Sequence, residues 1–149
     1  DTKSDIKVMC FNVHLLNDSS EARACCISNI IVEEDPDFVF LTEYYGSSSD
    51  TLLNAMLARY PYHETSNRWD NNCGDVFFSR WSIDTTENIK PRLSYGSMYR
   101  VQLSHEKDTL AIYCCHLSSN LLDFSPNKLD ALKKGYEERA KEAIVAAEL

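Results

Sequence analysis

Short apolar runs and one helical repeat alternate along the first third of the chain. The segment 6–13 has the composition of a strand, and 38–41 is apolar at every position, as in a strand buried on both faces of a sheet. Between them we predict a helix from Ser19 or Ser20 to about Glu34, because apolar residues recur at helical spacing at Ala22, Cys26, Ile27, Ile30 and Ile31. A strand, a helix and a strand in this order predict a right-handed crossover, which brings the carboxyl ends of two parallel strands to one edge of a sheet.

The rest of the chain mixes strands with two further helices. The pattern predicts a helix from about Asp50 to Tyr60 and strands at 76–78, 98–103 and 110–115, the last two joined as an antiparallel hairpin through 104–108. A final helix opens at Ser125-Pro126, and its apolar stripe consists of Leu129, Leu132, Tyr136, Ala140, Ala143 and Ala147. These elements predict the α/β class, with a mixed β-sheet and flanking helices.

Composition narrows the class of protein. With 149 residues, 44% of them hydrophobic, the chain is long enough for one compact domain, and its net charge of −8 excludes a strongly electrostatic grip on nucleic acid while leaving room for a local phosphate site. No apolar stretch is long enough to span a bilayer, so the chain is soluble as written. It begins without Met, which we interpret as a processed or cut chain, and an upstream targeting or membrane segment can be missing. The localisation therefore stays open.

Six cysteines raise the question of a metal or disulfide framework. Zinc sites usually draw two ligands from a C-x₂₋₄-C spacing, and this chain has two adjacent pairs instead. Cys10 and Cys114 lie inside apolar runs, where a thiol acts as a small hydrophobe. We expect buried, reduced thiols, with disulfides as the main alternative.

Three of the predicted strands end at a hard polar group. The first ends at Asn12, the second at Thr42-Glu43 and the last at His116. Ligands of α/β sheets bind outside the carboxyl ends of the strands. A carboxylate beside an amide oxygen suits Mg²⁺, and an imidazole nearby can donate to a phosphate oxygen or protonate a leaving group. The alternative is that polar residues merely end the strands where the chain leaves the core.

Other polar and aromatic residues have simpler interpretations. We expect His63 and His105 to be surface residues near turns, and Trp81 to contribute packing. The run 70–72 together with Asp75 resembles a calcium loop, but it lacks the EF-hand spacing, so we interpret it as a solvated turn.

Four motifs, in order, resemble the endonuclease/exonuclease/phosphatase superfamily, the deoxyribonuclease I-like group of metal-dependent phosphoesterases. They are Phe11-Asn12-Val13, Leu41-Thr42-Glu43, 74–80 and 113–117. The resemblance implies that Asn12 is a metal-site amide, that Glu43 is the metal-ligating carboxylate and that His116 contacts the scissile phosphate. The implied cofactor is Mg²⁺, with Mn²⁺ as an alternative.

The resemblance also implies an architecture. The family fold is a four-layer α/β/β/α sandwich in which each half of the chain supplies mainly one sheet, and residues 1–149 approximate its first half. Family members are longer and carry a later G-D-x-N motif and an S-D-H motif, which are absent from this sequence. We therefore interpret 1–149 as a partial domain that is catalytically inert alone, because cooperating residues fail as a unit.

The sequence thus predicts a metal-dependent phosphoesterase in the intact protein, acting on a phosphodiester or phosphomonoester by in-line attack of water. The alternative is a non-catalytic interaction module that keeps the fold. We also expect self-association, or pairing with the missing half, through an open sheet face that is formed by Val8, Cys10, Val101, Leu103, Ile112 and Cys114. The identity of the phosphate-ester substrate stays open.

Overall fold

The computed structural model describes residues 5–16, 21–45, 51–67, 73–89, 97–117 and 128–148. The elements in chain order are β1 (Val8–Leu16), α1 (Glu21–Glu34), β2 (Phe38–Tyr45), α2 (Thr51–Arg59), β3 (Tyr62–Asn67), β4 (Cys73–Ser79), β5 (Ser82–Asn88), β6 (Ser97–His105), β7 (Asp108–His116) and α3 (Lys128–Ala147). Contacts divide the chain into two compact units, one of Asp1–Thr86 with Val101–Ile112 and one of Glu87–Arg100 with Tyr113–Leu149. Within the described ranges, no helix is long and apolar enough to cross a membrane.

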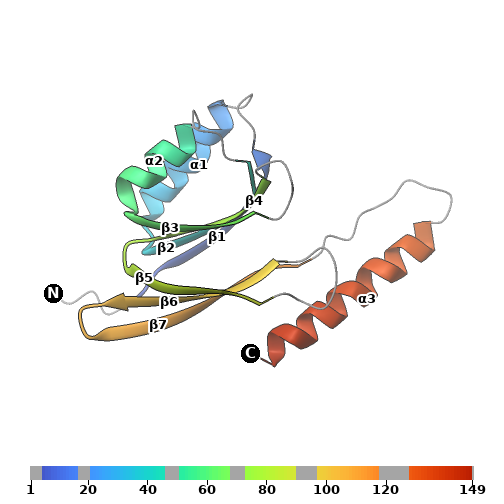
Figure 1. Cartoon of the computed structure of the whole chain (residues 1–149). Helices are drawn as coiled ribbons and strands as arrows, with labels where there is room; N and C mark the ends of the chain where they lie inside the picture. Colours follow the sequence, from blue (N-terminus) through green and yellow to red (C-terminus); the bar gives the residue numbers. More distant parts are fainter. Residues whose placement is uncertain are drawn as a thin grey trace. The chain divides into compact units, whose positions relative to one another are not determined.

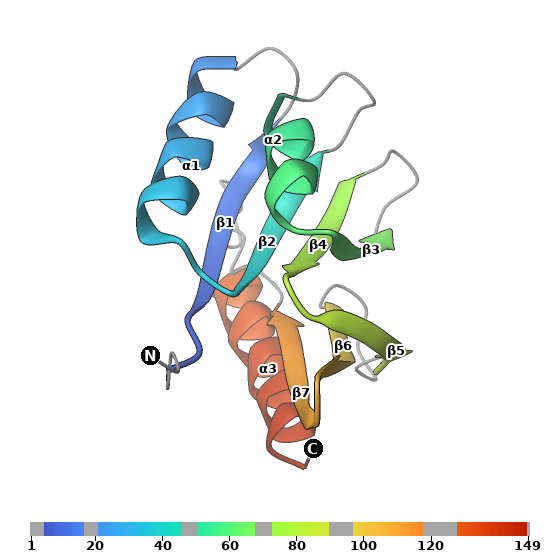
Figure 2. The ribbon, with the colours of Figure 1, turned by 90° about the vertical axis from the view of Figure 1, so that its left-hand side faces the viewer.

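A four-stranded sheet lies in the first unit, and α1 and α2 cover one of its faces (Figures 1 and 2). The strand order is β1-β2-β4-β3; β1 and β2 are parallel, and β4 is antiparallel to both of its neighbours. The parallel pair confirms the predicted strand-helix-strand crossover. Val39 and Leu41 of β2 pack with Ile27 and Ile31 of α1 in the buried core beneath the helices.

The opposite face of the sheet is aromatic. Phe38 stacks on Phe77 of β4 with ring centroids 6.0 Å apart, and Trp81 meets Phe38 edge-on at 5.4 Å. Trp81 in turn stacks on His105 at 5.2 Å. The packing role predicted for Trp81 is therefore confirmed, and β2 is buried on both faces, as its continuous apolar run predicted.

A second, three-stranded sheet has the order β5-β6-β7. Its hairpin turns at Glu106-Lys107, which confirms the hairpin predicted through 104–108. Two strands, β3 and β5, were not predicted from the sequence. Both lie at the end of their sheets and carry mainly polar residues, so they lack the apolar alternation that marks a half-buried strand.

The expected six-residue sheet face was wrong, and the expected burial of the thiols was wrong in part. Val8 and Cys10 belong to the four-stranded sheet and Val101, Leu103, Ile112 and Cys114 to the other, so the six residues do not form one face. Val101, Leu103 and Cys114 are buried, whereas Val8 and Cys10 are exposed because β1 lies at the end of its sheet. The expected burial of thiols holds for Cys114 but not for Cys10, Cys25 and Cys26. These four cysteines and Cys115 are free.

The apolar stripes predicted the buried side of α1 only in part, through Ile27 and Ile31, and did not predict that of α3. In α1 the buried residues are Ala24, Ile27 and Ile31, while Cys26 and Ile30 are exposed. In α3, Tyr136 and the three alanines of the stripe are exposed, and the buried side carries Glu142. Alanine offers little apolar area for burial, so the stripe did not decide which side of α3 packs. Ser125-Pro126, the predicted start of this helix, lies outside the described residues.

Candidate functional site

Three strands place polar residues in one row across the four-stranded sheet. This row lies within β1 and β2, which continue to Leu16 and Tyr45, so the prediction that they end at Asn12 and at Thr42-Glu43 was wrong. Asn12 of β1 is in register with Thr42 of β2, and Asp75 of β4 lies directly across from the Thr42 end of β2. Partners in register present their side chains on the same face of a sheet. Phe40 and Phe77, one step back along the same strands, show that this face is the aromatic one, which α1 and α2 do not cover.

A bulge interrupts β2 at this row. Leu41 pairs with Val76 and Tyr44 with Gly74, so Thr42 and Glu43 together face the single residue Asp75. Leu41 and Tyr44 both lie in the core beneath the helices although they are three residues apart, whereas regular alternation would put them on opposite faces. Alternation alone puts Thr42 on the face opposite Leu41. The bulge therefore changes the positions of Glu43, which regular alternation would put on the core side, and Tyr44, which it brings into that core.

The backbone of Glu43 has an unfavourable conformation at this bulge. Its φ is 54°, in the left-handed region that L-residues other than glycine seldom adopt. The pairing of β1 with β2 shifts at the same place, since the register moves from Asn12↔Thr42 to Leu16↔Tyr44. Glu43 thus lies where the ladders to both neighbouring strands become irregular. Strained residues of this kind concentrate at functional sites.

Exposure differs sharply along the row. Asn12 is exposed and Glu43 is half-buried, whereas Thr42 and Asp75 are 5% and 2% exposed. Cys10 lies one step back on β1. Although the residue is exposed by surface area, partial burial of its thiol and, secondarily, the negative charge of Asp75 raise the pKa of that thiol. The accessible groups at this edge are therefore an amide and a carboxylate, with a buried carboxylate behind them.

Asp75 is the residue that the sequence analysis misjudged. Grouped with 70–72, it was expected in a solvated turn; the structure places it inside β4, in register with Ser66 of β3. Residues 70–72 lie outside the described residues. The sequence did contain a sign of this position. Asp75 directly precedes the apolar run Val76-Phe77-Phe78, and a strand through that run can begin before Asp75 and include it.

His116 belongs to the second unit and is described within it. It is the last residue of β7, half-buried, and directly follows Cys114 and Cys115. Burial raises the pKa of the Cys115 thiol. The structure thus brings Asn12 and Glu43 to neighbouring positions in one unit and places His116 at a strand end of the other.

The donors at the row suit a hard cation. Glu43 and Asn12 offer oxygen atoms, and Mg²⁺ binds through one or two carboxylates while keeping several waters. Across the described ranges, no three His, Cys, Asp or Glu side chains come together as a metal-holding group.

Comparisons with known proteins agree on the architecture. No family model and no curated protein matches the sequence. Among solved structures, sphingomyelinase C from Streptomyces griseocarneus matches with a TM-score of 0.69 at 19% identity, over 96% of this chain and 59% of that one. The endonuclease/exonuclease/phosphatase from Beutenbergia cavernae DSM 12333 matches with a TM-score of 0.65 at 18% identity, over 97% and 44% of the two chains. Truncated TDP2 from Caenorhabditis elegans gives 0.63 at 17% identity, over 95% and 57%.

The chain has a deoxyribonuclease I-like fold. The fold implied by the four sequence motifs is therefore confirmed. The chain spans between 44% and 59% of the length of these three structures, so it corresponds to part of the deoxyribonuclease I-like fold as they contain it. One expectation about that fold needs correction: strands of two sheets, not mainly of one, lie within residues 1–149. At these identities the likeness concerns the fold, and the chemistry has to be argued from the residues.

Proposed function

We propose that this chain carries the metal-holding part of an Mg²⁺-dependent phosphoesterase site, with Mn²⁺ as an alternative ion. The proposal depends chiefly on one observation: Glu43 occupies a left-handed backbone conformation at a bulge, beside the row that contains Asn12, in a chain with a deoxyribonuclease I-like fold. A strand that merely ended at a polar residue would need neither the bulge nor the unfavourable φ.

Each residue has a stated role in the proposal. The Glu43 carboxylate and the Asn12 amide oxygen would hold the ion, which when bound supplies positive charge that stabilises the phosphate in the transition state. Thr42 and Asp75, which are buried in the same row, would keep this part of the sheet in place. His116 would donate a hydrogen bond to a non-bridging oxygen of the scissile phosphate, a role taken from the resemblance.

The proposal extends to the intact protein and not to this chain alone. The G-D-x-N and S-D-H motifs, which in the family position the attacking water and complete the phosphate site, are absent from residues 1–149. We propose that water attacks phosphorus in line in a protein that contains them, on a phosphodiester or phosphomonoester. Residues 1–149 alone should be inert, because removing part of a cooperating set of residues usually removes the whole effect.

Metal binding by the 149-residue chain tests the proposal without requiring activity. Mn²⁺ binding, followed by electron paramagnetic resonance, should be lost in Glu43→Gln and weakened in Asn12→Ala. The matched control is Glu106→Gln, because Glu106 also has a φ of 54° but lies in the β6–β7 turn. If Glu43→Gln binds Mn²⁺ as tightly as the wild-type chain, the assignment of this site is wrong.

The rival function is a non-catalytic interaction module that retains the fold. Downstream sequence distinguishes the two: G-D-x-N and S-D-H motifs following residue 149 in the parent gene favour the enzyme, and their absence favours the module. Hydrolysis of a generic phosphodiester with Mg²⁺ by the full-length product, compared with its Glu43→Ala variant, is the direct test.

A further inference from the structure

Asp75 is an ionisable residue in the interior of an otherwise apolar strand segment. It is 2% exposed, and the next three residues, Val76, Phe77 and Phe78, are 1%, 0% and 0% exposed. Burial of a carboxylate is costly unless donors satisfy its oxygen atoms. A strand whose task was only to fill the core would carry an apolar residue here, so the position of Asp75 calls for a specific reason.

The bulge supplies that reason. Asp75 alone faces Thr42 and Glu43, so β2 has one more residue at this point than β4 can pair with. The extra residue of a bulge lies outside the regular pairing of the ladder, so its backbone donor has to find an acceptor other than the usual partner on the next strand. An ionised carboxylate offers acceptors only, with capacity for several hydrogen bonds. The bulge therefore offers a backbone hydrogen-bond donor, and the Asp75 carboxylate offers acceptors.

We propose that Asp75 is a positioning residue that holds the bulge of β2 and thereby fixes the Glu43 carboxylate within that strand. This inference rests on the proposed function of Glu43 as a metal ligand. The left-handed conformation of Glu43 is unfavourable in itself, so a group outside β2 has to stabilise it. If the bulge relaxed to regular pairing, the strand would slip by one residue, and the side chains beyond Thr42 would exchange faces. Asp75 acts through the bulge and does not contact the substrate.

The test compares two variants of the same strand. Asp75→Asn keeps the shape of the side chain but replaces an acceptor oxygen with a donor group. Ser79→Ala is the control, because Ser79 is also buried in β4 but bonds to Trp81, with its Oγ 2.7 Å from the Trp81 carbonyl oxygen, away from the bulge. Amide hydrogen exchange of residues 42–44 should become about tenfold faster or more in Asp75→Asn, the equivalent of one lost buried hydrogen bond, and stay unchanged in Ser79→Ala.

Mn²⁺ binding by the same proteins provides the second measurement. Loss of a group that orients a metal ligand usually costs about 10- to 100-fold in metal affinity, so Asp75→Asn should bind Mn²⁺ at least tenfold more weakly than Ser79→Ala. Unchanged exchange at residues 42–44 in Asp75→Asn overturns the inference, as does an equal effect of both variants on affinity. If the wild-type chain does not bind Mn²⁺, or Glu43→Gln binds it normally, the proposed metal site fails, and the exchange measurement alone decides whether Asp75 holds the bulge.

Discussion

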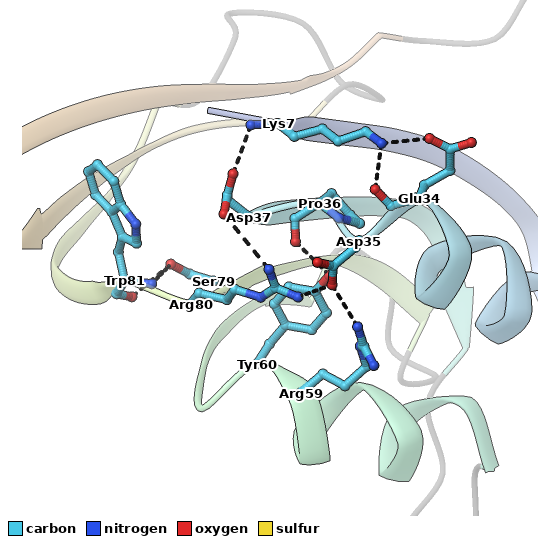
Figure 3. Close-up of polar contacts among 10 residues, drawn as sticks. All are labelled: Lys7, Glu34, Asp35, Pro36, Asp37, Arg59, Tyr60, Ser79, Arg80 and Trp81. Carbon is cyan, nitrogen blue, oxygen red and sulfur yellow. Dashed lines mark hydrogen bonds and ion pairs between the residues drawn. The ribbon is translucent and has the colours of Figure 1, made fainter. Parts of the chain in front are cut away.

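The guanidinium of Arg80 donates a hydrogen bond to the carboxylate of Asp35, although 45 positions separate the two residues in the sequence. Arg59, at the end of α2, reaches the same carboxylate oxygen at 2.7 Å, and the Arg80 guanidinium also lies 5.5 Å from the centre of the Tyr60 ring (Figure 3). Asp35 precedes β2, and Arg80 follows β4, so the cluster joins the ends of two neighbouring strands to a helix. It holds the start of β2, whereas the bulge at Glu43 lies near the end of that strand.

Asp35 makes stability depend on pH. The hydrogen bond and charge of Arg80, followed by those of Arg59, lower the pKa of the Asp35 carboxyl below its ordinary value of 3.8. A carboxyl with a lowered folded-state pKa stabilises the protein fully above its unfolded pKa and loses that contribution as the pH falls through the folded value. Asp35→Asn should therefore be less stable than wild type at neutral pH, with the difference shrinking below about pH 4.

Urea titrations at several pH values measure this difference. Asparagine suits the test because it tolerates the φ of 46° at this position. A constant difference between the two proteins from neutral to acid pH would contradict the assigned role of the Asp35 charge.

The Tyr60 hydroxyl contributes to the same region. Tyr60 is fully buried, and its hydroxyl donates to the Pro36 carbonyl oxygen at 2.9 Å. Tyr60→Phe leaves that carbonyl without its donor and should lower the free energy of unfolding by about 1–2 kcal/mol. Tyr62→Phe is the control, since Tyr62 is 41% exposed, and its effect should stay within about 0.5 kcal/mol. Equal urea midpoints for the two variants would show that the hydroxyl bond does not stabilise the fold.

Replacing Glu43 by glycine should stabilise the protein and remove metal binding. Glycine adopts positive φ without steric cost, so Glu43→Gly should raise the free energy of unfolding by about 1 kcal/mol while abolishing Mn²⁺ binding. Glu106→Gly, at the other glutamate with a φ of 54°, should give a similar gain and leave Mn²⁺ binding unchanged. Thermal unfolding of the two variants measures the gain. A loss of stability in Glu43→Gly would mean that the carboxylate itself stabilises the bulge.

Thiol alkylation reports on the environment of Asp75. Burial first, and then the charge of Asp75, raise the pKa of the Cys10 thiol, so less thiolate is present at neutral pH and alkylation by iodoacetamide is slowed. Asp75→Asn removes the charge and should speed alkylation of Cys10 while retaining the part of the slowing that is due to burial. Mass spectrometry of tryptic peptides measures the rate, and buried Cys114 should stay unmodified until the protein unfolds. If Cys10 is alkylated at the same rate in Asp75→Asn as in the wild-type chain, the charge of Asp75 does not affect this thiol.

If the chain self-associates, we expect the contact to involve β1 and not the six-residue sheet face that the sequence predicted. This strand lies at the end of its sheet, and Val8 and Phe11 within it are 54% and 37% exposed, as is Ile6 just before it at 47%. Apolar edge strands of this kind readily pair with another chain. We expect concentration-dependent association in sedimentation velocity and its loss in Val8→Lys, while Ile144→Lys, at a residue of α3 that is 59% exposed, should still associate. A wild-type chain that stays monomeric at high concentration would contradict this prediction.

Local sequence was sufficient for most elements. The apolar run of 38–41 predicted a strand buried on both faces, because no other arrangement satisfies four consecutive apolar residues in a sheet. The parallel pairing of β1 with β2 followed from the intervening helix, and it placed Asn12 and Glu43 at one edge. The motifs that surround them predicted the deoxyribonuclease I-like fold.

Tertiary structure alone decided the details on which function depends. The repeat of apolar residues in α3 marks an apolar side, but only long-range contacts determined that the side with Glu142 is buried and that Tyr136 is exposed. Likewise, regular alternation carries no sign of a bulge: the left-handed φ of Glu43 and the burial of Asp75 depend on how β4 pairs with β2. Periodicity reflects the geometry of one element, whereas register and burial arise from the balance of pairing, packing and strain between elements distant in sequence.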